Sequence, residues 1–242
     1  MKKIIIANWK MCLSFKETQL LLEKIATFDN YNHSLIVCPD FLNLARAASI
    51  LRNTKIKLGS QNCSFHHHGA YTGEISALDI KETEAEYVII GHSERRRIFK
   101  EDNSMINQKI KIALEAKLKP ILCLGENLLE RNNGRTRPVL KAQLKNALKG
   151  IKIKKANDLI LAYEPVWAIG SGQPMEYEEA NKMHKYIAER AYALTGKKLS
   201  VIYGGSVKLD NAHDFISQKN IAGLLVGGAS LKADSLKQLL NI

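Results

Sequence analysis

The chain alternates eight times between short apolar runs and longer amphipathic segments, and this alternation restricts its possible folds more than any other feature. The apolar runs are rich in β-branched residues and nearly continuous, which is typical of parallel strands buried on both faces. In chain order, the predicted strands are residues 4–7, 35–38, 56–60, 87–90, 121–124, 159–163, 200–203 and 223–226. The pattern therefore predicts an α/β fold built on a parallel sheet.

The segments between the runs show helical periodicity. Leu21, Ile25 and Phe28 are spaced i, i+4, i+7, behind a capping box formed by Ser14 and Glu17. The same apolar spacing recurs over residues 106–114, 140–148 and 177–191. We therefore expect a helix to connect each strand to the next.

Eight strand–helix units, with no linker or low-complexity segment between them, predict a single-domain (β/α)8 barrel over residues 1–242. The alternative is an open, doubly wound α/β sheet. Such a sheet typically binds a nucleotide through a G-x-G-x-x-G turn after an early strand, and no such turn follows the first strand here. The barrel is therefore the favoured fold.

The net charge of +12 is the unusual bulk property of the chain. Nucleic-acid binding is one interpretation, but the lysines are spread along the chain and form no long basic run with interleaved aromatic residues. We therefore predict no nucleic-acid partner, and expect the positive field to help gather an anionic substrate. We also expect no membrane partner, because no apolar run approaches the length needed to cross a bilayer.

Four cysteines lie far apart in the chain, at Cys12, Cys38, Cys63 and Cys123. The absence of a C-x-x-C pair argues against a zinc site and a disulfide framework. The N-terminal apolar stretch is over at Asn8, which makes it too short for a signal peptide. We therefore expect reduced thiols and a cytoplasmic protein.

Catalytic residues of a barrel occupy the C-terminal ends of the strands and the loops that follow them. The candidates at these positions are Asn8, Lys10, His92, Glu94, Glu164, Ser206, Gly227 and Gly228. They offer a carboxylate, an imidazole, an ammonium group and several glycines. These groups suit a reaction that moves a proton next to a carbonyl in an anionic substrate.

Six segments of the chain resemble the signatures of the triosephosphate isomerase family. They are residues 7–11 (ANWKM), 69–74 (GAYTGE), 91–96 (GHSERR), 162–170 (AYEPVWAIG), 203–207 (YGGSV) and 226–229 (VGGA). They follow the family's order from the first predicted strand to the last, so the resemblance covers essentially the whole chain. It implies a TIM barrel that interconverts dihydroxyacetone phosphate and D-glyceraldehyde 3-phosphate, a reaction of glycolysis and gluconeogenesis, without a cofactor.

The resemblance also implies a role for each candidate. Glu164 is expected to be the general base, His92 the electrophile that serves the substrate oxygens, and Lys10 a fixed charge for enediolate and phosphate. The apolar run after Glu164 places its carboxylate to be desolvated, which makes it a stronger base. Asn8 is expected to position Lys10 and the substrate oxygens. Glu94 is expected to pair with a lysine or arginine rather than to react.

No G-x-x-x-x-G-K-[ST] phosphate loop occurs in the chain. The substrate phosphate is instead expected on backbone N–H groups after the seventh and eighth strands, at Ser206, Gly227 and Gly228. Glycine suits this role because a Cβ would keep the backbone away from the phosphate oxygens. Residues 165–172 resemble the family's hinged lid, from which Gly170 is expected to donate its N–H to the phosphate.

Other segments lead to expectations about the oligomeric state, a metal site and a turn. The loop over residues 61–74 resembles the family's interface loop, which inserts into a partner subunit, so a homodimer is expected. Cys12-Leu13 stands where the family commonly has Asn-Gly. His66-His67-His68 suggests a metal site, but consecutive residues rarely ligate one ion, so no metal is expected. Gly204-Gly205 is interpreted as a tight turn.

Two other functions remain open from the sequence. One is a different phosphate-binding barrel enzyme, such as another sugar-phosphate isomerase or an aldolase. A Schiff-base aldolase needs a reactive strand lysine, and the predicted strands from the fourth to the eighth contain none in their cores. The other is a basic binding protein on an inactivated barrel, which the intact Glu164, His92 and Lys10 disfavour.

Overall fold

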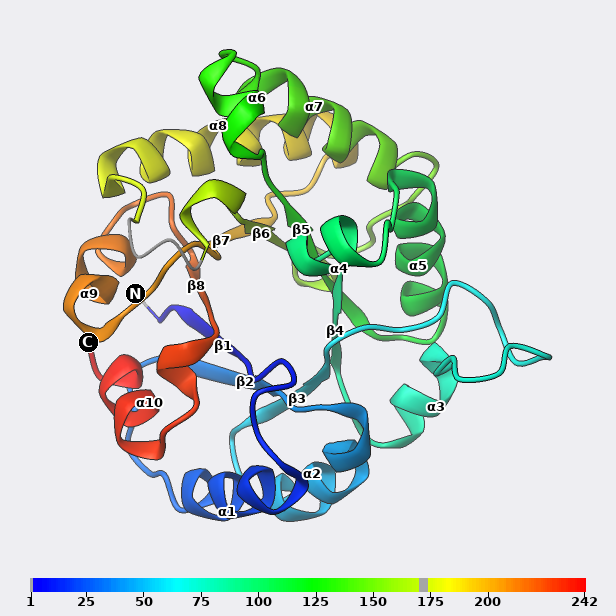
Figure 1. Ribbon diagram of the computed structural model, residues 1–242, viewed down its shortest axis with the longest axis vertical. Helices are drawn as coiled ribbons and strands as arrows, with labels where there is room; N and C mark the ends of the chain where they lie inside the picture. Colours follow the sequence, from blue (N-terminus) through cyan, green and yellow to red (C-terminus); the bar gives the residue numbers. More distant parts are fainter. Residues whose placement is uncertain (1, 170–173) are drawn as a thin grey trace.

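Eight parallel strands form a closed barrel in chain order, with β1 paired to β2 on one side and to β8 on the other (Figure 1). The structure is a computed structural model that describes residues 2–169 and 174–242. The strands are β1 (Ile4–Asn8), β2 (Ser34–Cys38), β3 (Lys57–Ser60), β4 (Tyr87–Ile90), β5 (Lys119–Leu124), β6 (Ile160–Tyr163), β7 (Ser200–Tyr203) and β8 (Gly223–Val226). The predicted (β/α)8 barrel is confirmed, and all eight predicted strands are present.

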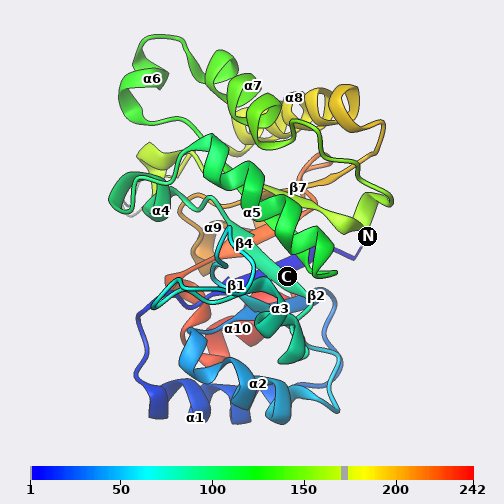
Figure 2. The ribbon, with the colours of Figure 1, turned by 90° about the vertical axis from the view of Figure 1, so that its right-hand side faces the viewer.

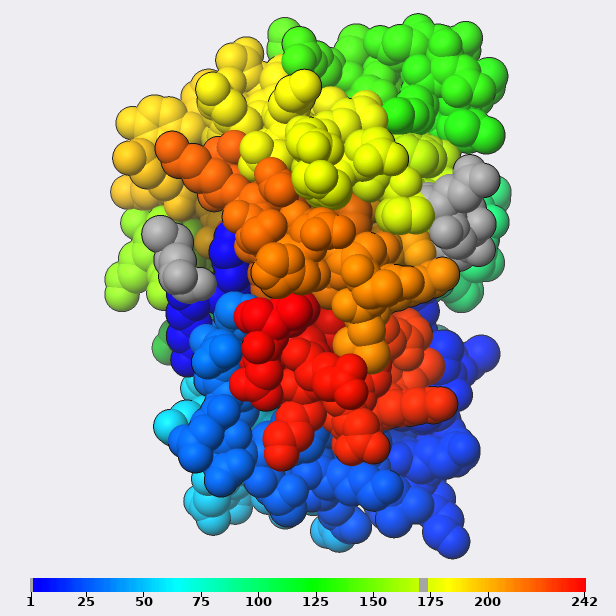
Figure 3. All heavy atoms as spheres, turned by 90° about the vertical axis from the view of Figure 1, so that its left-hand side faces the viewer, coloured from blue at the N-terminus to red at the C-terminus, as the bar shows by residue number. Residues whose placement is uncertain are grey.

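Helices follow the strands and surround the barrel. The α-helices are α1 (Phe15–Ala26), α2 (Leu44–Leu51), α3 (Ala77–Glu82), α4 (Ser93–Ile98), α5 (Asn103–Glu115), α6 (Leu128–Asn132), α7 (Thr136–Ala147), α8 (Tyr177–Thr195), α9 (Leu209–Ile216) and α10 (Ala233–Leu240). The described residues also form short 3-10 helices, which are η1 (Phe41–Asn43), η2 (Ala156–Asp158), η3 (Val166–Ala168) and η4 (Gly228–Ser230). Along one side, α8, α9 and α10 form a continuous outer layer (Figure 3). In the described part of the chain, no helix combines the length and apolarity needed to cross a membrane.

The predicted capping box of α1 is present. The Glu17 N–H donates to the Ser14 hydroxyl, and the Glu17 carboxylate accepts the Ser14 N–H at 2.8 Å. These bonds satisfy donors that the first turn of a helix leaves without partners. The helix therefore begins where the sequence predicts.

Two hydrophobic cores explain why the strands are apolar on both faces. In β1, Ile6 points into the barrel and packs in an inner cluster with residues such as Ile89 and Ile202. Its neighbours Ile5 and Ala7 belong to the larger cluster between the strands and the helices. Successive side chains of a strand point to opposite faces, so a strand buried on both faces reads as a continuous apolar run.

All strands run the same way, so the barrel has two chemically distinct ends. The segments after the strands, including α4 and α6, lie at one end, and the N-terminus lies at the other (Figure 2). The four cysteines are free thiols, as predicted. Three of them are buried, whereas Cys12 is exposed after β1. Burial raises the pKa of Cys63 to about 12, which leaves that thiol unreactive at neutral pH.

His184 is a buried histidine on α8 that lies outside the cavity formed by the strand ends. Its ring contacts the rings of Tyr163 and Tyr203, with centroids 5.7 and 6.1 Å away. Its Nδ1 lies 2.6 Å from the carbonyl oxygen of Ala180, so the neutral ring donates its proton there. Burial lowers the pKa of His184 from 6.5 to about 4.

We predict that His184 makes the protein less stable as the pH falls from about 6.5 to 4. In this window the unfolded chain binds a proton on His184 and the folded chain does not, so acid favours unfolding. Urea unfolding at several pH values, compared between wild type and His184→Gln, measures the effect. The variant should lose less of its free energy of unfolding on acidification, and equal losses in both proteins would contradict the prediction.

Candidate active site

A cavity of about 670 Å³ opens at the C-terminal ends of the strands. The predicted residues that line it are Asn8, Lys10, His92, Glu164, Ser206, Gly227 and Gly228. They come from the ends of β1, β4, β6, β7 and β8, and only closure of the barrel brings them together. Glu94 lies beside the cavity as a partner of Lys10. Gly170 falls outside the described residues.

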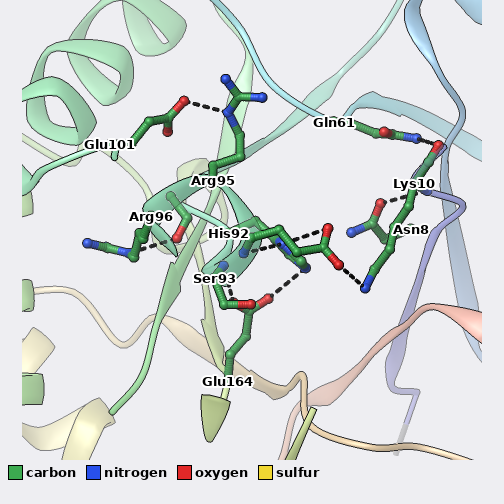
Figure 4. Close-up of polar contacts among 11 residues, drawn as sticks. Asn8, Lys10, Gln61, His92, Ser93, Arg95, Arg96, Glu101 and Glu164 are labelled. Carbon is green, nitrogen blue, oxygen red and sulfur yellow. Dashed lines mark hydrogen bonds and ion pairs between the residues drawn. The ribbon is translucent and has the colours of Figure 1, made fainter. Parts of the chain in front are cut away.

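The Glu164 carboxylate lies at the floor of this cavity with 1% of the residue exposed. The Ser93 N–H donates to its Oε2 at 2.8 Å, and its Oε1 lies 3.2 Å from Nε2 of His92 (Figure 4). The backbone of Glu164 packs closely against Gly125, where an added Cβ would lie 1.7 Å from the Glu164 carbonyl oxygen. Glycine at position 125 therefore lets the base sit against β5.

His92 is the N-cap residue of α4, and this position sets the orientation of its ring. The Glu94 N–H donates to Nδ1 of His92 at 3.3 Å. A nitrogen that accepts a hydrogen bond carries no proton, so the proton of the neutral ring is on Nε2. Nε2 faces Glu164 and lines the cavity, so it can donate to a substrate oxygen bound beside the carboxylate.

Lys10 has a left-handed backbone with φ of 52°, which is uncommon for a residue with a side chain. Gln61 Nε2 donates to the carbonyl oxygens of Lys10 and Cys38 at 2.8 and 3.0 Å, and the Lys10 N–H donates to Asn8 Oδ1 at 3.2 Å. These bonds hold the backbone in a conformation that costs on the order of 1–3 kcal/mol. The strain lets the ammonium group reach the cavity.

The Lys10 ammonium group also pairs with Glu94, at 2.6 Å between Nζ and Oε1. Burial by itself would raise the pKa of Glu94, but the hydrogen bond from Lys10 and the neighbouring positive charges lower the pKa below its usual value. Glu94 is therefore a carboxylate at neutral pH. It restrains the Lys10 side chain without lining the cavity.

The glycines after β7 and β8 differ in whether the surrounding protein leaves room for a side chain. A Cβ added at Gly228 would meet no described atom within 4 Å, so protein packing does not require glycine there. At Gly205 a Cβ would lie 2.2 Å from the Tyr203 hydroxyl oxygen, and at Gly204 it would lie 3.0 Å from Cγ of Glu164. Neither Gly204 nor Gly205 has a positive φ. Close packing against Glu164 and Tyr203 therefore explains this pair. Residue 205 lies in a bend, and no hydrogen-bonded turn is present at 204–205.

Glu126 is a buried carboxylate that the sequence analysis missed. The Trp167 indole N–H donates to it at 2.9 Å, the Tyr163 hydroxyl lies 3.1 Å away, and its carbonyl oxygen accepts the Val166 N–H. Burial raises its pKa above the usual value. Glu126 thereby ties the segment after Glu164 to the barrel. A signal was available, because Glu126 follows a predicted strand.

The three consecutive histidines lie apart from the cavity. Nε2 of His68 is 2.9 Å from Asp79 Oδ1, and Nε2 of His67 is 3.7 Å from Glu115 Oε2. Across residues 2–169 and 174–242, no group of three or more His, Cys, Asp or Glu side chains could hold a metal ion.

The geometry suits transfer of a proton next to a carbonyl. A buried carboxylate supplies a base, Nε2 of His92 supplies a neutral donor, and Lys10 supplies a positive charge for an oxyanion. The glycine-lined side of the cavity leaves room for a phosphate against the backbone. These groups converge on one small-molecule site.

Comparison with known proteins identifies the family. The sequence model of the family described as "Triosephosphate isomerase" matches residues 3–242. The triosephosphate isomerase of Dehalococcoides mccartyi is 47% identical over 247 residues, covering 97% of this chain and 94% of that protein. That of Dictyoglomus turgidum is 43% identical over 240 residues, covering 97% and 96%. The crystal structure of triosephosphate isomerase from Bartonella henselae superposes with a TM-score of 0.88 at 35% identity, covering 99% and 97%. The chain therefore belongs to the triosephosphate isomerase family.

Proposed function

We propose that the protein interconverts dihydroxyacetone phosphate and D-glyceraldehyde 3-phosphate through an enediolate. The observation that carries this proposal is the buried Glu164 carboxylate, whose Oε1 lies 3.2 Å from Nε2 of His92 at the floor of the cavity. Membership of the triosephosphate isomerase family supports the choice of substrate. The free thiols are compatible with the cytoplasm, where we expect this enzyme to act in glycolysis and gluconeogenesis.

Glu164 acts as the general base. Its Oε2 is held by the Ser93 N–H, whereas no described residue hydrogen-bonds its Oε1. A carboxylate oxygen without a hydrogen-bond donor keeps its lone pairs free to accept a proton from the substrate. Oε1 takes the proton from the carbon next to the substrate carbonyl, and the same oxygen returns it to the neighbouring carbon. One carboxylate thus carries out both proton transfers at carbon.

His92 and Lys10 stabilise the charge that this proton transfer creates. The carbonyl oxygen becomes an enediolate oxygen, to which Nε2 of His92 donates a hydrogen bond. The ring then moves protons between the two substrate oxygens. The Lys10 ammonium group is paired with Glu94, and the Lys10 backbone N–H is held by the Asn8 amide oxygen. The ammonium group attracts both the enediolate and the phosphate.

The phosphate binds to backbone N–H groups at Ser206, Gly227 and Gly228, with Gly170 as a further donor. Ser206, Gly227 and Gly228 line one side of the cavity. Lys208 also lines this side and adds a second positive charge near the phosphate, a contribution that the sequence analysis missed.

We predict that Glu164→Gln lowers kcat by about a thousandfold or more, because the amide cannot accept the substrate proton. A coupled assay of triose phosphate interconversion measures the loss. Glu178→Gln, which removes an exposed carboxylate from α8, is the matched control and should retain full activity. Near-normal turnover by a folded Glu164→Gln protein would show that another group is the base.

A second prediction concerns the phosphate site. Gly228→Val should raise KM at least about tenfold and weaken inhibition by inorganic phosphate, because the new side chain fills space that the phosphate needs. The added Cβ meets no described atom within 4 Å, so the melting temperature should stay close to that of wild type. Ala156→Val, at an exposed position in η2, serves as the control. Unchanged phosphate inhibition would place the phosphate elsewhere.

The active enzyme is a homodimer in this proposal. A second cavity of about 350 Å³ lies beside Lys10, and its rim includes Met11 and Phe99, which are 95% and 61% exposed. The loop over residues 64–76 projects away from the barrel between β3 and α3 (Figure 1), and Ser64 and Ile75 hydrogen-bond at its base. This loop of one copy fills the cavity of the other and covers the exposed apolar rim.

We predict that Tyr71→Glu, at the tip of this loop, converts the dimer to a monomer and lowers kcat, because the partner no longer packs against the segment that carries Lys10. The sedimentation coefficient and kcat, measured over a range of protein concentrations, should both be lower than those of wild type. Leu194→Glu introduces the same charge at an exposed apolar position on α8 and should leave the dimer intact. A fully dimeric Tyr71→Glu protein would rule out this interface.

A further inference from the structure

Most of the net positive charge lies at the end of the barrel opposite the active site. The segments 116–119, 148–159, 196–199 and 217–222 lead into β5, β6, β7 and β8. Together these 26 residues contain nine lysines and a single carboxylate, Asp158, a net charge of +8 out of +12 for the chain. Because β5 to β8 are neighbours in the barrel, the nine lysines form one arc around its N-terminal end, here called the lysine arc.

The lysine arc is exposed and poorly neutralised. Seven of its nine lysines are exposed, the exceptions being Lys119 and Lys197, which are half-buried. Lys119 pairs with Glu86 at 3.2 Å, and no other lysine of the arc forms an ion pair with a described residue. Asp158 accepts the backbone N–H of Lys155. Crowded like charges repel one another and oppose folding, so this arrangement favours binding of an anionic partner.

The active site does not account for this charge. The strands β5 to β8 have four to six residues, so about 13–20 Å of barrel separates the arc from the cavity. This separation exceeds the Debye length of about 8 Å at physiological salt. The expected role of the net charge, gathering an anionic substrate, therefore does not apply to the lysine arc.

The composition of the arc indicates which polyanion fits it. Its four segments contain no aromatic residue on which bases could stack and no arginine for bidentate contacts to base edges. Their large apolar side chains, such as Leu118, Ile153 and Ile221, are buried in the core or, like Ile151, packed against it, so none is free to insert into a hydrocarbon layer. What remains is a broad set of flexible ammonium groups on one end of the molecule. Such a set matches a planar array of phosphate groups.

We propose that the lysine arc docks the protein on the headgroups of an anionic lipid bilayer, with the mouth of the active site facing away from the membrane. This contact is peripheral and electrostatic, so it needs none of the membrane-spanning segments whose absence led the sequence analysis to predict no membrane partner. Each lysine near such a surface strengthens binding about fivefold. The contact leaves catalysis unchanged, because the arc and the active site lie at opposite ends of the barrel.

The test is flotation of the full-length protein with vesicles of phosphatidylcholine alone, and of equal parts phosphatidylcholine and phosphatidylglycerol. The arc variant carries Lys→Gln at Lys117, Lys152, Lys154, Lys155 and Lys198. The control variant carries Lys→Gln at five exposed helix positions, Lys16, Lys24, Lys111, Lys141 and Lys185, so that both lose the same charge. Duplex RNA is added as a competitor in a parallel series.

We expect wild type and the control variant to bind the phosphatidylglycerol vesicles and to be released by salt. At about fivefold for each of five lysines, the arc variant should bind about three thousandfold more weakly, while both variants keep the kcat and KM of wild type. Equal loss of binding in the two variants, or no binding by wild type at low salt, would overturn the proposal. The proposal would also be overturned if duplex RNA displaced the protein from the vesicles at an RNA phosphate concentration below that of the lipid phosphate. That result would identify the lysine arc as a nucleic-acid surface.

Discussion

Closure of the parallel barrel is the constraint on which the remaining structure depends. Pairing of β1 with β8 places the C-terminal ends of all eight strands around one opening. A Cβ at Gly223 would lie 2.0 Å from the carbonyl oxygen of Ile4, so this seam closes only around glycine. Because of closure, residues as distant in sequence as Lys10 and Gly228 line the same cavity.

Within that opening, the position of Glu164 organises the chemistry. A carboxylate is costly to bury, and the structure supports it with one N–H, from Ser93, and with a backbone held against β5. His92 faces it because the start of α4 fixes the imidazole ring. The same short helix thus holds both the base and the proton donor, which keeps their separation at 3.2 Å.

The two ends of the barrel have different electrostatic roles. Near the active site, Glu94 balances the charge of Lys10. The effect of Lys10 on a bound anion therefore depends on where its ammonium group lies and not on the net charge of the site. At the opposite end, the lysine arc has a single carboxylate among its nine lysines. Catalysis and attachment to a charged surface can then vary independently, since the strands separate the groups responsible for each.

Local sequence patterns predict the eight strands, the start of α1 and the identities of the residues at the strand ends. These features are local, because they depend on the alternation of side chains and on capping groups a few residues apart. Glu126 follows a predicted strand and could have been found by the same rule. Other features follow from the folded chain alone. They are which oxygen of Glu164 faces His92, why Gly205 must lack a side chain, and that lysines from residue 117 to residue 219 gather at one end. Such contacts join distant segments, and packing rather than local pattern sets their geometry.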